Sequence, residues 1–311
     1  MTLISEFKEG DSLTTQLLVG NVAKCVNNTG GAYLNIELRD CSGVINAKKW
    51  EISDSDEKLF VVGNIVEVEI EVLLYRSSLQ AKILSAKLVD CDAIDINKFV
   101  KQPPVKKEEL IERLNKHIST IKNEDCQKLL KYFFNKFGEK IYVSPAASSI
   151  HHEYSSGLLM HIVSMCDIAV SVMKLYDDIN HDLLLTGIIL HDFGKMIELE
   201  GKVIYKYSLE GKLLGHISIM MGELRLAQEQ LQLDNELMVI IEHMILSHHG
   251  YLEYGSPELP LVKEALLLSL IDNLDSKMVI ASKALEGIEK GEFTQKIFAL
   301  DSRCLYNPKI K

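Results

Sequence analysis

An ordered series of histidines and aspartates, spread over the second half of this 311-residue chain, constrains its fold more than any other feature. Each member lies in or next to an apolar stretch of helical length; the series is His161, His191-Asp192, His216, His248-His249 and Asp272. Imidazole nitrogens and carboxylate oxygens bind divalent transition metals. Buried together without a metal, they would leave charges and polar atoms unpaired. We therefore expect several apolar helices to meet around metal ions.

The centre of this series is the pair His191-Asp192, which follows the apolar run LLLTGIIL. Adjacent helix positions point about 100° apart, so the pair can bind one metal from two directions or bridge two metals. Asp272 lies among leucines and isoleucines, where an ionised carboxylate needs a partner or a cation. A single core histidine is more often a hydrogen-bonded structural residue, so the metal prediction depends on the set.

Composition and length favour a two-domain globular protein. The apolar fraction of 47% supports sizeable cores, and the length suits two domains. The six cysteines form no CxxC pair, which argues against a zinc knuckle or a disulfide framework and fits a cytoplasmic protein. The N-terminus lacks a signal-peptide pattern, and no apolar run is long and free enough of charge to span a bilayer. We expect no membrane partner.

The first 90 residues have the alternation of short antiparallel strands. The runs AYLNIELRD and NIVEVEIEV alternate polar with apolar residues, and Asn27–Gly31 is a turn signal. Five strands in this length predict an OB-like barrel over residues 1–90. A linker over 91–107 contains Pro103-Pro104, and helical patterns follow. The predicted fold is an N-terminal five-stranded OB-like β-barrel followed by an all-α domain over 108–311, which includes a C-terminal tail.

OB-folds bind single-stranded nucleic acid by stacking bases on aromatic rings over a basic groove. The candidates in the predicted barrel are Tyr33, Trp50, Tyr75, Lys48 and Lys49. Trp50 suits the barrel core equally well. The net charge of −10 argues against nucleic acid, as do the 9 basic and 13 acidic residues of positions 1–90. Positions 98–140 hold 11 basic and 6 acidic residues, which predicts either a solvated helix face or a phosphate-contacting surface.

The order of His161, His191-Asp192 and Asp272 resembles the HD-domain metallophosphohydrolase superfamily, and His216 with His248-His249 resembles its two-metal branch. The likeness extends to the runs HHEYSSGLLMH, ILHDFGK, GKLLGHI, ILSHHGYLEYGSPELP and IDNLDSKM. Together with the OB-like segment, they resemble the YhaM family of bacterial 3′→5′ exoribonucleases over nearly the whole chain. The sequence departs from that family at Ser155-Ser156, where a second small residue or glycine is usual. This departure concerns a loop and leaves the ligand positions unchanged.

The resemblance implies two divalent metal ions. His161, His191, Asp192 and Asp272 would hold the first, while Asp192 would bridge to a second held by His216 and by His248, His249 or both. Histidine-rich ligation favours manganese, cobalt, iron or zinc over magnesium, and the family points to manganese. Two cations ~4 Å apart can promote an in-line phosphoryl displacement.

The resemblance also implies roles for residues outside the ligand set. Asp192 and Lys195 would act in catalysis, with Lys195 on the scissile phosphate, although complementing the dipole at a helix C-terminus would explain Lys195 equally well. His152 would contact phosphate or support a ligand. For Asp275 a surface salt bridge is favoured over the orientation of a ligand. Structural roles are expected for His117, His151, His181 and His243.

The function that follows is metal-dependent 3′→5′ hydrolysis of single-stranded RNA, with single-stranded DNA as a further substrate, to nucleoside 5′-monophosphates. The family implies a homo-oligomer. One alternative is an HD-domain phosphohydrolase acting on free or cyclic nucleotides, with the OB-like segment as an interaction module. Another is an inactive single-strand binder with a structural metal. The full ligand set argues against the inactive binder, and the barrel with the basic stretch argues against the nucleotide hydrolase.

Overall fold

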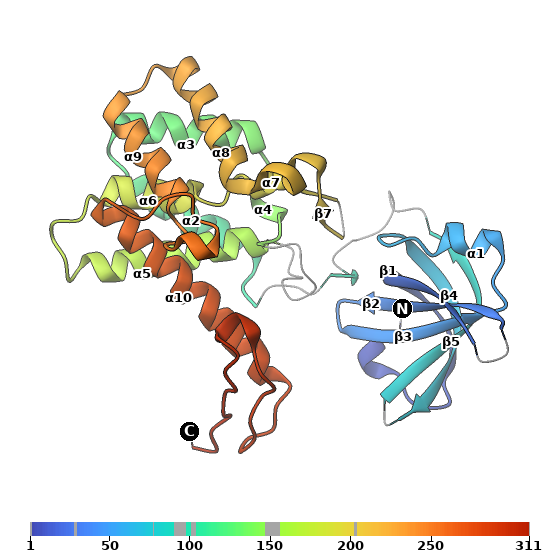
Figure 1. Ribbon diagram of the computed structural model, residues 1–311. Helices are drawn as coiled ribbons and strands as arrows, with labels where there is room; N and C mark the ends of the chain where they lie inside the picture. The colour runs from blue at the N-terminus through green and yellow to red at the C-terminus, as the bar shows by residue number, and fades with distance from the viewer. Residues whose placement is uncertain are drawn as a thin grey trace. The chain divides into compact units, whose positions relative to one another are not determined.

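The computed structural model describes residues 2–27, 30–76, 78–89, 98–100, 104–146, 156–201 and 204–310. The chain forms two compact units (Figure 1). The first is built on Met1–Pro104 and includes Glu200–Lys206. The second is built on Val105–Ala147, Ser156–Leu199 and Tyr207–Lys311.

The first unit is a closed five-stranded barrel, which confirms the predicted OB-like fold. Its strands pair in the order β1-β2-β3-β5-β4. The elements are η1 (Ile4–Glu6), β1 (Ser12–Val26), β2 (Ala32–Asp40), β3 (Gly43–Trp50), α1 (Asp54–Leu59), β4 (Ile65–Tyr75) and β5 (Ser78–Leu88). β1 closes the barrel because its first half pairs with β4 and its second half with β2. A register shift between Val19 and Asn21 interrupts the pairing with β2 shortly after this change of partner.

Period-two alternation fills the barrel with apolar side chains. Leu17 and Val19 of β1, Ile36 of β2 and Val68 and Ile70 of β4 are all fully buried. Their neighbours along each strand point outward, as the pleat requires. The outer face of β2 and β3 is therefore free to carry polar and aromatic side chains.

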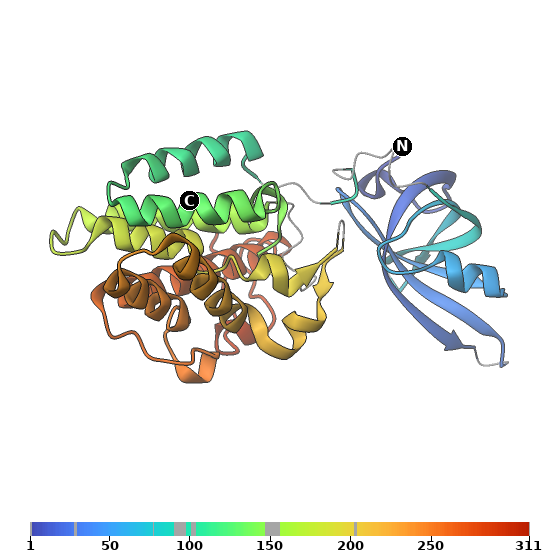
Figure 2. The same ribbon diagram turned by 90° about the horizontal axis from the view of Figure 1, so that it is seen from above.

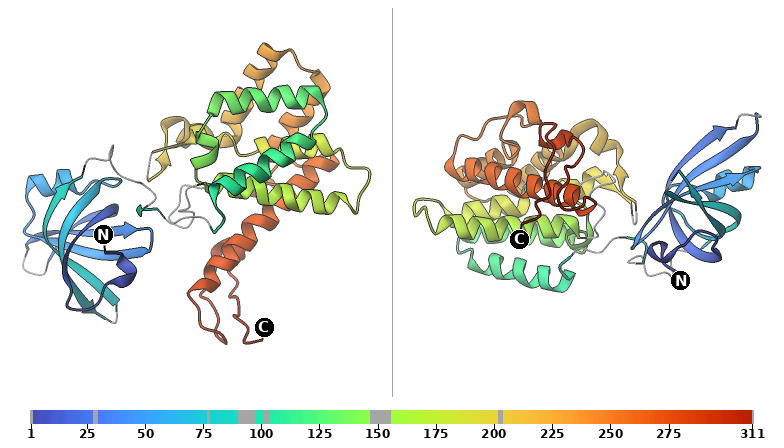
Figure 3. Two further views of the ribbon diagram at one scale, coloured as in Figure 1. Left: turned by 180° about the vertical axis from the view of Figure 1, so that it is seen from behind. Right: turned by 90° about the horizontal axis from the view of Figure 1, so that it is seen from below.

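The second unit is helical, which confirms the other half of the predicted fold. Its helices are α2 (Lys107–Thr120), α3 (Glu124–Phe137), α4 (Lys140–Val143), α5 (Gly157–Met173), α6 (His181–Leu190), α7 (Lys195–Glu198), α8 (Leu209–Leu231), α9 (Asn235–Leu246) and α10 (Lys263–Glu286). Its short elements are η4 (Leu252–Tyr254) and η5 (Phe298–Leu300). The strands β6 (Leu199–Glu200) and β7 (Lys206–Tyr207) each have one residue in either unit. Figure 2 shows the helices gathered around one core, and Figure 3 shows the last turns of α10 extending beyond the others.

Helix α6 lies at the centre of this unit and determines where the polar residues meet. It begins after Asn180, whose side chain accepts hydrogen bonds from the amides of Asp182 and Leu183. Every residue from Leu184 to Leu190 is buried, so α6 is surrounded by other helices. A Cβ at Gly187 would lie 2.3 Å from the methyl carbon of Met244 on α9. This close packing brings the C-terminal ends of α6 and α9 together.

Among the residues that the structure describes, no helix has the length and apolarity needed to cross a membrane.

Candidate metal centre

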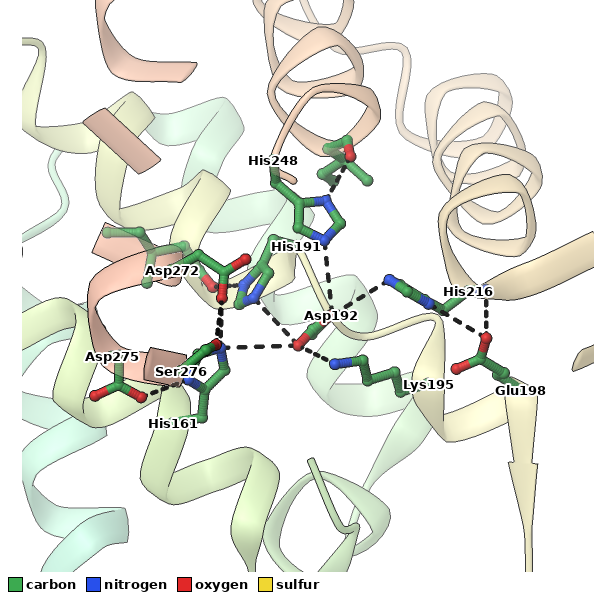
Figure 4. Close-up of polar contacts among 12 residues, drawn as sticks. His161, His191, Asp192, Lys195, Glu198, His216, His248, Asp272, Asp275 and Ser276 are labelled. Carbon is green, nitrogen blue, oxygen red and sulfur yellow. Dashed lines mark hydrogen bonds and ion pairs between the residues drawn. The ribbon is translucent and has the colours of Figure 1, made fainter. Parts of the chain in front are cut away.

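Five helices of the second unit bring the seven predicted metal ligands together. Figure 4 labels all of them except His249. His191-Asp192 follows α6 and His248-His249 follows α9, while His161, His216 and Asp272 lie on α5, α8 and α10. The ligand atoms of three groups lie within 4.8 Å of one another: His161, His191 and Asp192; His191, His248 and Asp272; and His216, His248 and His249. The three groups overlap, so the whole set forms one centre.

The carboxylate of Asp192 divides this centre into two halves. Its Oδ2 lies 3.2 Å from Nε2 of His191 and 3.9 Å from Nε2 of His161. Its Oδ1 lies 3.6 Å from Nε2 of His216 and 3.9 Å from Nε2 of His248. One oxygen therefore faces the side formed by α5 and α6, and the other faces the side formed by α8 and α9. A carboxylate placed this way can bridge two cations.

The second ring nitrogen of each of these histidines is already engaged. The Nδ1 partners are Asp275 Oδ2 for His161, Ile188 O for His191, Glu198 Oε1 for His216, Ile245 O for His248 and Tyr254 O for His249, at 2.7–3.2 Å. Carbonyl and carboxylate oxygens only accept, so each Nδ1 carries the proton and each Nε2 offers a lone pair to the centre. This arrangement is the one in which histidines bind metals in proteins.

Three of these Nε2 atoms also lack hydrogen-bond partners where a metal would lie. Among the described residues, Nε2 of His191, His216 and His248 and Oδ1 of Asp192 are buried without a hydrogen bond. A buried polar atom without a partner costs roughly 1–3 kcal/mol. Four such atoms pointing at one volume fit a site for metal ions, because coordination would satisfy all of them.

Electrostatics keep Asp192, His248 and His249 in the forms that a metal requires, and His161 is the exception. Burial opposes ionisation of Asp192, but Lys195 and the neighbouring histidines outweigh it and hold the pKa of this carboxyl well below its usual range. Burial holds the pKa of His248 well below its usual value and lowers that of His249, so both rings are neutral at pH 7. Burial also disfavours the charged form of His161, but hydrogen bonds to Asp272 and Asp275 raise its pKa to about 9. At this position a metal ion would replace a proton.

Lys195 lies in the first turn of α7, and its Nζ donates a hydrogen bond to Asp192 Oδ2 at 2.7 Å. Burial lowers the pKa of this ammonium, but the charge of Asp192 outweighs burial and raises it. Lys195 is therefore cationic throughout the neutral range. Its side chain remains 19% exposed, so an anionic ligand can reach it.

Glu198 holds His216 in place and was not predicted from the sequence. Its Oε1 accepts both the backbone N–H of His216, at 3.0 Å, and the Nδ1–H of the ring. Two glycines allow the close approach of α7 and α8: a Cβ at Gly194 would meet the carbonyl of His216, and one at Gly211 the carbonyl of Glu198, each at 2.1 Å. At Gly215, φ of +72° breaks α8 just before His216. These contacts fix the backbone at His216 and thereby the position of its ring in the centre.

The favoured prediction for Asp275, a surface salt bridge, is wrong. The residue is 8% exposed and accepts hydrogen bonds from His161 Nδ1–H at 2.7 Å and Ser164 Oγ–H at 2.5 Å. It lies one turn beyond Asp272 on α10, so both carboxylates face His161 on α5. Its role is to orient His161.

The remaining histidines fall outside the centre or outside the described residues. His117 pairs with Asp167, His181 with Asp182, and His243 accepts the backbone N–H of Leu261. His151 and His152 lie outside the described residues.

On the barrel, four of the five predicted nucleic-acid contacts come together. The rings of Tyr33 and Trp50, paired across β2 and β3, have centroids 4.5 Å apart. Nζ of Lys48 lies 5.5–5.8 Å from the ring centroids of Tyr33, Trp50 and Tyr75. Lys49 points to the other face of β3, because side chains alternate, and donates to Leu84 O at 3.1 Å. The structure thus separates Lys49 from this aromatic cluster.

Comparisons with known proteins cover both units. A model of the HD domain family matches residues 158–277. The chain is 42% identical over 306 residues to "3'-5' exoribonuclease YhaM" of Geobacillus sp. strain WCH70. The aligned residues cover 98% of this chain and 94% of that protein.

Two solved structures show weaker likenesses. The second OB-fold domain of replication protein A from Methanococcus maripaludis is 20% identical, over 30% of this chain and 98% of that chain, with a TM-score of 0.25. A replication protein A heterotrimer bound to single-stranded DNA is 18% identical, over 36% of this chain and 29% of that chain, with a TM-score of 0.26. At these TM-scores, the two structures add nothing to what the strand order of the barrel shows.

Proposed function

Because the chain belongs to the YhaM family of exoribonucleases, we propose that it removes nucleotides from the 3′ end of single-stranded RNA, with single-stranded DNA as a further substrate. The centre around Asp192 is the proposed active site, and the cytoplasm is its proposed location. The observation that carries the proposal is the bridging position of the Asp192 carboxylate among buried imidazole nitrogens without partners.

We propose two divalent ions per chain, with manganese the first choice and cobalt, iron or zinc as alternatives. One would be held by His161, His191 and Asp272, the other by His216, His248 and His249, with Asp192 shared. When bound, such a pair supplies a nucleophile at neutral pH and stabilises charge on the leaving oxygen.

The reaction is hydrolysis of the terminal phosphodiester. Water adds to phosphorus, and the 3′ oxygen of the preceding nucleotide leaves with a proton, which yields a nucleoside 5′-monophosphate and a shortened strand. Lys195 donates to a non-bridging oxygen of the scissile phosphate and offsets the charge that grows there. The carboxylates of Asp275 and Glu198 keep His161 and His216 oriented throughout.

The barrel supplies binding to the strand away from the reacting end. Tyr33, Trp50 and Tyr75 offer ring faces for bases, and Lys48 offers charge to the backbone. These groups lie on the outer face of β2 and β3 and on the β4–β5 hairpin, the surfaces that OB-folds use for oligonucleotides.

Removing the aromatic cluster should weaken recruitment of long substrates. The double substitution Tyr33→Ala with Trp50→Ala should raise KM for a 20-nucleotide RNA about 10-fold or more, because stacking contributes about 1–3 kcal/mol per base. Turnover of bis(p-nitrophenyl) phosphate, which has no base, should change far less. Val44→Ala, at the other end of β3 and 49% exposed, is the control. Equal losses on both substrates would mean that the barrel serves folding or assembly.

Substitutions of the two orienting carboxylates should loosen different metal ions. Glu198→Gln should weaken the binding of one of the two ions by about 10- to 100-fold, because the carboxylate that accepts from His216 becomes a neutral amide, which is a weaker acceptor. Asp275→Asn should weaken the other ion, since it supports His161 from the opposite side. Competitive metal titration and elemental analysis measure both effects. If each variant binds two ions as tightly as the native protein, these carboxylates do not position ligands.

One assay separates the proposed function from the nucleotide hydrolase. Labelled single-stranded RNA, 3′,5′-cyclic nucleotides and nucleoside triphosphates are supplied to the metal-loaded protein under identical conditions. Rapid shortening of the RNA, with slow or undetectable turnover of the nucleotides, is expected. Rapid turnover of the nucleotides with intact RNA would contradict the proposal.

A further inference from the structure

Two exposed tyrosines follow the histidine pair of the metal centre. Tyr251 and Tyr254 are 55% and 49% exposed, and their rings meet edge to face with centroids 5.4 Å apart. By contrast, Phe133 and Phe193 lie fully buried in the helical core. The two tyrosines therefore contribute little to that core.

A network of hydrogen bonds fixes these tyrosines to the metal centre. The Nδ1–H of His249 donates to the carbonyl of Tyr254 at 2.9 Å, so this tyrosine and a candidate ligand share one hydrogen bond. The amides of Tyr254 and Ser256 both donate to the carbonyl of Tyr251, at 3.0 and 3.3 Å. Ser256 Oγ–H, which is buried, is within hydrogen-bond distance of the carbonyls of Leu246 and Glu258, both at 2.9 Å. The pair is thus tied to the C-terminal end of α9.

The tyrosine segment also adjoins a less buried ligand of the centre. His191, Asp192 and His248 are buried and form its floor. His249, to which Tyr254 is bonded, is only partly buried. A phosphodiester must approach where solvent reaches the centre, and the partly buried His249 is bonded to the segment that carries the two exposed rings.

We propose that Tyr251 and Tyr254 form a stacking subsite for the nucleobase of the nucleotide being released. This inference deepens the proposed exonuclease function and depends on it. An aromatic face accepts any of the four bases, because every base has a π-face. Such a subsite suits an enzyme that must hold each successive 3′-terminal nucleotide whatever its sequence. It is separate from the aromatic cluster of the barrel, which belongs to the other unit.

The test compares two RNAs that differ only in whether the 3′-terminal nucleotide carries a base. For the native enzyme, kcat/KM should be at least about 10-fold lower for the abasic end than for the base-bearing end, because the stacking contact is lost. Tyr251→Ala with Tyr254→Ala should lower kcat/KM for the ordinary RNA to a similar level and abolish the discrimination. Tyr251→Phe with Tyr254→Phe, which keeps both ring faces, should retain it. Tyr176→Ala removes a tyrosine of similar exposure beside Lys263 and should leave discrimination unchanged.

Metal content and the thermal unfolding transition of each variant establish that the centre is intact. If the double alanine variant still prefers the base-bearing end as strongly as the native enzyme does, the stacking subsite is wrong. If the native enzyme shortens neither RNA, the exonuclease proposal itself fails. A native enzyme that shortens both RNAs equally well would exclude recognition of the terminal base by any residue.

Discussion

Asp192→Asn is expected to reduce RNA hydrolysis by a factor on the order of 10³ or more, with the fold retained. The two oxygens of this carboxylate face opposite halves of the centre, 3.2 Å from His191 Nε2 and 3.6 Å from His216 Nε2. An amide offers one weaker oxygen ligand and one N–H group, so it cannot bridge two cations. Loss of a single preorganised electrostatic group costs about 10²–10³-fold in other enzymes, and Asp192 serves both metals.

Single-turnover hydrolysis of a labelled RNA, elemental analysis and circular dichroism together measure this effect. Asp167→Asn is the matched control, because Asp167 pairs with Arg113 and His117 on another face of α5. The control should keep both metal and activity. An Asp192→Asn enzyme that hydrolyses RNA at the native rate would remove Asp192 from the active site.

Lys195→Met should lower kcat on the order of 10²-fold in the metal-loaded enzyme, because the ammonium offsets charge that grows on the phosphate. The substitution keeps the length and apolar stem of the side chain. Since the neighbouring carboxylate raises the pKa of Lys195, the native ammonium stays protonated as the pH rises through the neutral range. Deprotonation of Lys195 should therefore set no alkaline limit on the native rate below about pH 10.

Alternatively, Lys195 serves only as a counter-ion for Asp192, whose Oδ2 lies 2.7 Å from the lysine Nζ. In that case Lys195→Met would lower the free energy of unfolding of the metal-free protein, since it leaves a buried carboxylate unpaired. The kcat of the metal-loaded enzyme would then be unchanged. Lys195→Arg, which keeps the charge, should recover part of the lost rate if the side chain acts on phosphate.

The clustering of the predicted ligands was foreseeable from the sequence because few side chains bind transition metals. Histidines and aspartates in apolar surroundings are costly without a partner, so their order along the helices is informative. Glu198 had no such signal: it follows the apolar pair Met196-Ile197, and glutamates are common on helices. Its contact with His216 depends on the close approach that Gly194 and Gly211 allow, and that approach is a property of tertiary packing.

In the barrel, too, the sequence predicted some features and missed others. Strand alternation predicted the five strands, but helix α1 was missed because six residues are too few to show helical periodicity. A capping box at its start, with Ser53 and Asp56 exchanging hydrogen bonds, was the available signal. The two lysines Lys48 and Lys49 were grouped by composition, whereas the pleat separates them onto opposite faces of β3.

The proposed enzyme shortens a single strand from its 3′ end. The most direct measurement uses a 5′-labelled RNA with a single-stranded 3′ tail, beside the same RNA with its tail paired in a stable hairpin. We predict a ladder of labelled products that shortens from the 3′ end and stops near the duplex, with the paired substrate intact. Immediate release of a labelled mononucleotide, or cleavage of a circular RNA, would contradict it.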